Sequence, residues 1–107
     1  MPRAARQADT EIAQLEQRVD EAARLLKLLA SESRLLILCR LVAEREMPVG
    51  ALAAAVGLSQ SALSQHLAKM REDGLVATRR EAQTVFYRIA DPNARRVLAL
   101  LKSIYCP

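Results

Sequence analysis

The sequence has few of the residues that most often carry enzyme chemistry. Its 107 residues include one histidine, two cysteines, no tryptophan and 3% aromatic residues; the three reactive side chains are His66, Cys39 and Cys106. A single histidine argues against a Ser-His-Asp enzyme and cannot form a multi-histidine metal site within one chain. Two cysteines cannot build a disulfide-rich secreted scaffold. We therefore expect no catalytic site and no cofactor.

Long hydrophobic runs are also missing. The longest apolar stretches are Leu35–Cys39 and Ala51–Val56, far short of the roughly 18 residues that a membrane-spanning helix requires. The first residues contain arginine but no apolar core, so they do not read as a signal peptide. We therefore expect a cytoplasmic protein with no membrane partner, whose thiols start reduced.

The composition is that of a folded domain with a basic surface. Hydrophobic residues make up 51% of the chain and charged residues 26%, which predicts a single packed domain over residues 1–107. Sixteen basic and twelve acidic residues give a net charge of +4. This excess suggests a polyanionic partner, although an ordinary solvated surface would have the same charge.

Helical periodicity dominates the first half of the chain. Apolar residues between Ile12 and Leu29 recur at alternating intervals of three and four, as in a coiled-coil seam. That seam packs either on a second copy of the chain or on its own domain. Residues 34–44 are apolar on nearly all sides, and Ser31 can cap them, so we expect this helix in the middle of the domain.

The middle of the chain predicts a helix-turn-helix unit. Pro48 begins a short helix that runs to Val56, and Gly57 suits the left-handed residue that ends it. Ser59 can cap a further helix that continues to about Glu72. In such a unit the second helix enters the major groove of DNA, with its N-terminal residues nearest the bases.

The period then changes from that of a helix to that of a strand. Residues 75–80 and 84–89 alternate as β-strands around a polar tip at 81–83. Asp91 and Pro92 then begin a strongly apolar last helix. The predicted fold is mainly α (α+β): a winged helix-turn-helix with five helices and a two-stranded β-hairpin wing.

Candidate DNA contacts lie on the recognition helix and the wing. They are Ser59, Gln60, Ser61, Ser64, Gln65 and His66 on the helix, with Arg79 and Arg80 on the wing. Glutamine can pair with adenine, whereas arginine suits phosphates or a minor groove. Residues 59–90 hold five basic and three acidic side chains, a net charge of +2. Because this charge is modest, we expect two chains on a palindromic operator; a non-specific architectural protein is the alternative.

The stretches SRLLILCRLVAE and VGALAAAVGLSQSALSQHLAKMREDGLVATRREAQTVFYRI resemble the ArsR/SmtB family of dimeric winged-helix repressors. The resemblance covers about residues 22–106. It implies a homodimer through the first and last helices, and an inducer that lowers DNA affinity. Many members sense metals through a Cys-x-Cys pair in the short helix or through Asp and His on the last helix. This sequence lacks both patterns, which disfavours metal sensing at those sites and a metal ligand set.

The positions of Cys39 and Cys106 resemble the thiol-switch branch of that family, in which the matching pair becomes a disulfide or a polysulfide bridge. The resemblance implies a repressor that senses reactive sulfur species and releases its operator when the pair is bridged. A general peroxide sensor and a metal-sensing repressor are the alternatives. Without the resemblance, Cys39 reads as a small buried hydrophobe and Cys106 as an incidental terminal residue. A thiol oxidoreductase is disfavoured because there is no Cys-x-x-Cys motif.

Overall fold

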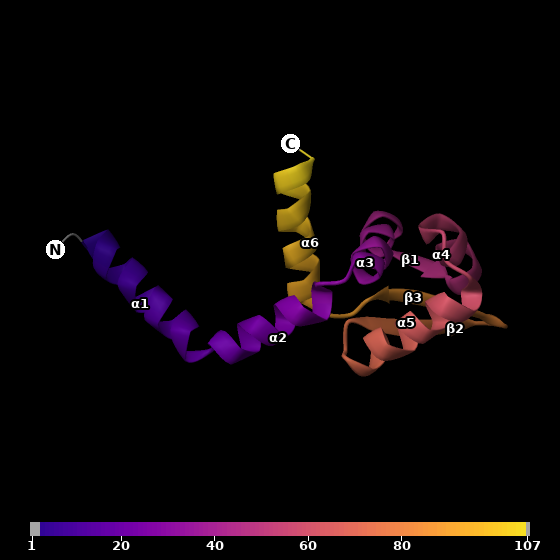
Figure 1. Cartoon of the computed structure of the whole chain (residues 1–107), viewed down its shortest axis with the longest axis horizontal. Helices are drawn as coiled ribbons and strands as arrows, with labels where there is room; N and C mark the ends of the chain where they lie inside the picture. The colour runs from indigo at the N-terminus through magenta and orange to yellow at the C-terminus, as the bar shows by residue number, and fades with distance from the viewer. Residues whose placement is uncertain (1–2, 107) are drawn as a thin grey trace.

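The computed structural model describes residues 3–106, with side chains from residue 8 onward, as a winged helix-turn-helix domain with a long helical arm (Figure 1). The elements are α1 (Arg3–Gln17), α2 (Val19–Leu29), α3 (Glu32–Glu44), β1 (Glu46–Pro48), α4 (Val49–Val56), α5 (Gln60–Glu72), β2 (Val76–Glu81), β3 (Thr84–Ile89) and α6 (Pro92–Tyr105). The predicted fold class is thereby confirmed. Within the described residues, no helix has the length and hydropathy required to cross a bilayer.

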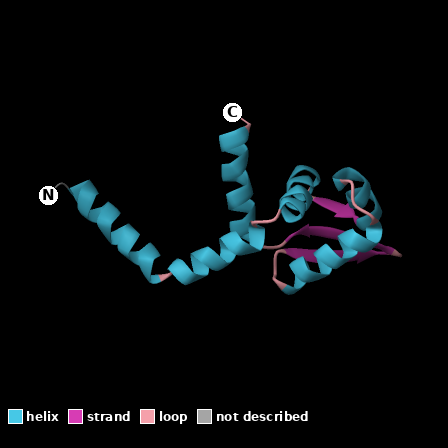
Figure 2. Ribbon diagram, viewed as in Figure 1, coloured by secondary structure: helices cyan, strands magenta, loops and turns pink. Residues whose placement is uncertain are grey.

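The arm consists of two helices where the sequence predicts one continuous seam. The helix breaks at Arg18, whose φ of −121° and ψ of 24° leave the helical region. Arg18 also forms an ion pair with Glu21 at 2.7 Å, in the first turn of α2. No glycine or proline marks this position, so the usual sequence signals of a helix end are missing. The described residues therefore form six helices rather than five, and Figure 2 shows the break as a short loop.

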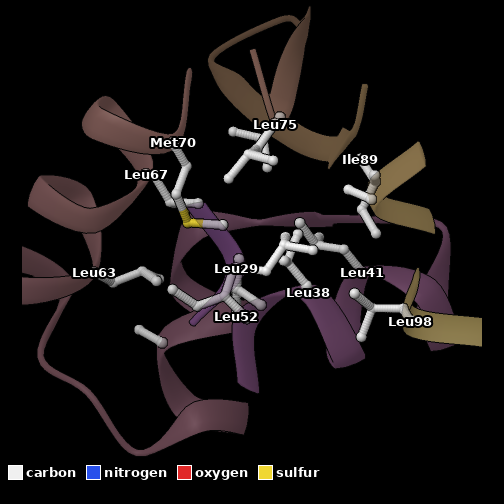
Figure 3. Close-up of a cluster of buried hydrophobic side chains, with 14 residues drawn as sticks. Leu29, Leu38, Leu41, Leu52, Leu63, Leu67, Met70, Leu75, Ile89 and Leu98 are labelled. Atoms are coloured by element: carbon white, nitrogen blue, oxygen red, sulfur yellow. The ribbon is translucent and has the colours of Figure 1, made fainter. Parts of the chain in front are cut away.

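Helices α3, α4 and α5 pack with the sheet and the start of α6 around one apolar core. In Figure 3, side chains from these elements point toward one another: Leu38 and Leu41 of α3, Leu52 of α4, Leu63, Leu67 and Met70 of α5, and Leu98 of α6. Among the described residues, no polar or charged side chain is buried. As predicted, α3 occupies the middle of the domain. Its Leu36 and Cys39 are nevertheless exposed, so one side of α3 remains open.

The helix ends follow the sequence signals closely. Ser31 and Ser59 each accept a hydrogen bond from the backbone N–H three residues on, and Asp91 accepts from the N–H groups two and three residues on, at the start of α6. Gly57 adopts the left-handed conformation, with φ of 72°. Pro48 precedes α4 rather than forming its first turn. Gly57 and Ser59 thereby define the turn between α4 and α5, and thus the helix-turn-helix geometry.

The sheet contains a third strand that the sequence does not predict. Strand β1 pairs antiparallel with β3, so the order is β1-β3-β2 and Glu46 lies opposite Arg88. This strand has three residues and ends in proline, too short for an alternating pattern to be recognised. The predicted hairpin of β2 and β3 is confirmed, with a two-residue tip at 82–83 because Glu81 pairs with Thr84.

Candidate DNA interface and dithiol groove

Helix α5 buries one face and exposes the other. Leu63, Leu67 and Met70 anchor it in the core. Of the predicted DNA contacts, the exposed ones are Ser59, Gln60, Ser61, Ser64 and Gln65, whereas His66 is half-buried. The accessible side chains therefore cluster at the N-terminal half of the helix. That is the half which meets base edges when such a helix enters a major groove.

The first two of these side chains already have local contacts. The Ser59 Oγ accepts a hydrogen bond from the N–H of Ala62 at 3.1 Å, so this hydroxyl caps the helix and retains its own hydrogen for donation. The amide of Gln60 lies near Gly50 of α4: a Cβ built on that glycine would be 3.5 Å from the Gln60 Nε2. Gln60 is nevertheless exposed, so its amide is accessible at the surface.

The two wing arginines differ in their surroundings. Arg79 reaches across β3 to form an ion pair with Glu46 of β1, and its Nη1 donates to Glu81 at 2.9 Å. Its guanidinium also lies 4.6 Å above the Phe86 ring. These two carboxylates raise the pKa of Arg79, and the hydrogen bond from Arg79 holds the pKa of Glu46 below its ordinary value. The charge of Arg79 is therefore offset within the wing.

Arg80 is exposed on β2, opposite Val85. Successive side chains of a strand point to opposite faces, so Arg80 points away from the face on which Arg79 contacts Glu46. Its guanidinium remains accessible to a phosphate, and of the two predicted wing contacts it is the better placed. The sequence could not distinguish them, because Glu46 lies 33 residues before Arg79.

The hairpin tip and the N-terminal end of α5 both lie at the right-hand end of the molecule in Figure 1, whereas α1 lies at the left-hand end and α2 and α6 lie between the two ends. Exposed basic residues Lys69 and Arg71 lie in the last turn of α5; they were not among the predicted contacts, although their charge alone makes them candidates for phosphates. The predicted DNA-contacting parts are thus separated from the arm and from α6.

The two cysteines line one groove between α3 and α6. Cys39 lies on α3, Cys106 follows the last turn of α6, and both are exposed and free. The groove has a volume of about 660 Å³. Its walls are mostly apolar, from Leu35, Val42, Leu98 and Leu101, and Lys102 and Tyr105 also line it. Cys39 is therefore not a buried core residue, and the fold brings together two thiols that lie 67 positions apart in the sequence.

Among the described residues, no group of three or more His, Cys, Asp and Glu side chains could hold a metal ion. Cys106 is held at the end of α6 by a hydrogen bond from its N–H to the carbonyl oxygen of Lys102, at 2.8 Å. An apolar groove with two accessible thiols can support thiol oxidation or sulfur transfer, because each thiol can be attacked and each can resolve the product of the other.

A second surface consists of large apolar side chains left exposed on the arm and on α6. We call this set the apolar arm surface: Ile12 and Leu15 of α1, Val19 and Leu26 of α2, and Leu100, Ile104 and Tyr105 of α6. Each is more than half exposed. Large apolar side chains exposed in such number on neighbouring helices make this part of the molecule a candidate interaction site.

The chain is similar in sequence to known bacterial regulatory proteins. Residues 31–78 match the family described as bacterial regulatory protein, arsR family. The chain is 45% identical over 98 residues to the HTH-type transcriptional regulator YgaV of Escherichia coli K12, covering 92% of this chain and 99% of that protein.

Two solved structures share both fold and sequence with this chain. Reduced HlyU from Vibrio cholerae has a TM-score of 0.79 and 49% identity, covering 88% of this chain and 98% of that one. The transcriptional repressor BigR from Xylella fastidiosa has a TM-score of 0.81 and 40% identity, covering 89% and 96%.

Proposed function

This chain belongs to the arsR family of bacterial regulatory proteins, and from that premise we propose that it is a homodimeric, thiol-switched regulator. In this proposal the reduced dimer binds a palindromic operator in the cytoplasm and represses transcription. Reactive sulfur species then bridge Cys39 to Cys106, and the dimer releases the DNA. The chain is a DNA-binding transcriptional regulator and not an enzyme; the dimer, the inducer and the switch are the proposal.

The apolar arm surface supports the dimer. Its residues come from the first two helices and the last helix, the same elements that the sequence resemblance assigns to dimerisation. A second copy would cover these side chains from water, at about 25 cal/mol of stabilisation for each Å² of apolar area removed. Two chains would also double the phosphate contacts, which the small charge of a single recognition unit makes necessary for tight binding.

One observation carries the switch: both thiols line the same apolar groove, and the groove joins α3 to α6. Helix α3 is the central core helix, whereas α6 contributes to the apolar arm surface. A covalent link across the groove would therefore connect the DNA-binding core directly to the proposed dimer contact. Such a link can change how the two protomers are oriented, and a coupling of about 1–3 kcal/mol would suffice to lower operator affinity 5- to 150-fold.

The experiment treats the reduced protein separately with inorganic polysulfide and with hydrogen peroxide, and measures the intact mass of each product. Gain of one or more sulfur atoms with loss of two hydrogens, located between Cys39 and Cys106 by peptide mapping, is the expected result with polysulfide. Loss of two hydrogens alone under both reagents would instead support a general oxidant sensor. No reaction, together with tight zinc binding, would overturn the thiol switch and favour a metal sensor.

A further inference from the structure

Arg34 connects the arm to the recognition helix. It lies in the first turn of α3, and its Nη1 donates a hydrogen bond to the carbonyl oxygen of Leu28 at 2.9 Å, in the last turn of α2. Its Nη2 donates to Oδ2 of Asp73 at 3.3 Å, at the C-terminal end of α5. The Arg34 side chain is only 14% exposed. One guanidinium thus contacts the ends of two helices that are 40 residues or more apart in the chain.

The contact to α2 satisfies a backbone group that the helix itself leaves open. The last four carbonyls of a helix have no partner within it, and Leu28 supplies one of these oxygens. A cation at that end also interacts favourably with the helix dipole. Otherwise α2 is attached to the domain by buried Leu29 and half-buried Leu25 and Leu28. Apolar contacts of this kind are non-directional, so the hydrogen bond adds a directional constraint on the angle of the helix.

The contact to α5 explains an acid at an unfavourable place. Asp73 follows the last residue of α5, where the negative end of the helix dipole disfavours a carboxylate. It also adds negative charge to the helix that is expected to approach DNA phosphates. Asp73 therefore neither stabilises the helix nor increases nonspecific attraction to DNA. Its favourable interaction in the structure is the ion pair with Arg34.

We propose that Arg34 and Asp73 are positioning residues that hold α5 at a fixed orientation to α2, so that operator recognition depends on their contact. The inference rests on the proposed function. Two recognition helices in a dimer must be separated by about 34 Å to enter successive major grooves. That separation depends on how each α5 is oriented relative to the dimerising arm, and a guanidinium that bonds both helix ends sets this orientation.

Asp73→Asn tests the inference against a matched control, Glu72→Gln. Both variants remove one negative charge from adjacent positions at the same end of α5. Of the two carboxylates, Asp73 pairs with Arg34, whereas Glu72 has no ion pair within the described residues. The probes are a duplex selected by the wild-type protein from a random-sequence pool and a scrambled duplex of equal composition. Affinity for each is measured at fixed salt, with the dimer mass and circular dichroism of every variant.

Loss of the negative charge and loss of the contact with Arg34 should change the affinity for the selected duplex in opposite directions. Loss of a negative charge alone strengthens binding to both duplexes equally, as we expect for Glu72→Gln. Asp73→Asn should instead bind the selected duplex about ten-fold more weakly than Glu72→Gln does, with equal affinity for the scrambled duplex. Arg34→Lys keeps the charge but loses the planar fork that bonds two partners, so it should behave like Asp73→Asn.

Equal affinities of Asp73→Asn and Glu72→Gln for both duplexes would overturn the inference, whether or not Arg34→Lys folds. So would dissociation of the Asp73→Asn dimer, because the weaker binding would then follow from dimerisation rather than from helix orientation. If the wild-type protein itself fails to select any duplex from the pool, the proposed function fails first, and the two failures are thereby distinguished.

Discussion

Arg79 and Arg80 are neighbours in β2, but their side chains have different surroundings. Both are exposed, but Arg79 contacts Glu46, Glu81 and Phe86 within the wing, whereas Arg80 forms no ion pair among the described residues. A guanidinium already bonded to two carboxylates has less charge to offer a phosphate. The residue that approaches the DNA backbone is therefore expected to be Arg80, with Gln60 and Gln65 approaching the bases.

These roles predict different effects on DNA binding. Arg80→Ala should weaken binding to all duplexes alike and reduce the slope of log K against log salt by about 1 for each phosphate that Arg80 neutralises. Gln60→Ala and Gln65→Ala should leave that slope unchanged and reduce discrimination between a selected and a scrambled duplex by about 1–3 kcal/mol. Salt titrations with both duplexes measure the two quantities. An unchanged slope in Arg80→Ala would remove that residue from the interface.

The ion pair of Glu46 predicts a pH dependence of stability. Its pKa is lowered from an ordinary 4.5, chiefly by the hydrogen bond from Arg79. A lowered folded-state pKa stabilises the fold fully above the unfolded-state value, and the stabilisation is lost as pH falls through the lowered folded-state value. Glu46→Gln should therefore reduce stability at pH 7 and show a shallower decline below pH 4.5.

Urea unfolding at a series of pH values, from neutral to below the folded-state pKa of Glu46, measures this difference. Glu44→Gln provides the control, because Glu44 is an exposed carboxylate with no ion pair among the described residues. The same pH profile in Glu46→Gln and in the wild-type protein would show that the contact does not stabilise the wing.

The sequence predicts the start of a helix correctly where a side chain caps the backbone a few residues away. Ser31, Ser59 and Asp91 cap the helices that their positions predict. The break at Arg18 and strand β1 could not be predicted, because neither depends on a local signal: one lacks glycine and proline, and the other forms only when β3 pairs with it. The joint position of Cys39 and Cys106 likewise depends on the packing of α3 against α6.

Alanine substitutions at two glycines, one inside α4 and one in the turn after it, should have opposite effects on stability. Gly57 has a φ of 72°, which costs about 1–2 kcal/mol for a residue with a Cβ, so Gly57→Ala should lower the free energy of unfolding by roughly that amount. Gly50 lies inside α4, where a Cβ would make ordinary contact at 3.5 Å. Gly50→Ala should therefore stabilise the protein by roughly 0.5–1 kcal/mol. Denaturant unfolding of both variants measures the difference, and equal effects would contradict it.

The whole molecule has the predicted DNA contacts at one end, and an arm that makes few contacts with its own domain. In Figure 1 the arm extends to the left, and α6 rises beside the end of α2 near the middle of the view. The exposed apolar residues of these three helices make up the apolar arm surface. Each of these side chains stays more than half exposed, so the described part of the chain does not cover them. The seam between Ile12 and Leu29 left open whether its partner is the same domain or a second copy, and the exposure of Ile12, Leu15 and Leu26 favours a second copy.

Charged substitutions on this surface should separate the protomers. Leu26→Glu or Ile104→Glu would bury an unpaired carboxylate in the proposed dimer contact, at a cost of several kcal/mol, and should give a monomer at micromolar concentration. Ala54→Glu is the control, because Ala54 is exposed on α4, away from this surface. Sedimentation equilibrium measures the mass of each variant. A dimer that persists in both surface variants would place the interface elsewhere.

The connection between groove and DNA is most directly tested by operator affinity before and after polysulfide treatment. The affinity of the wild-type dimer for its selected duplex should fall about five-fold or more on treatment and recover on reduction. Cys39→Ser and Cys106→Ser should bind the same duplex as tightly as the untreated wild-type protein and keep that affinity when treated. Release of DNA by either treated serine variant would contradict a switch that requires both thiols of the groove.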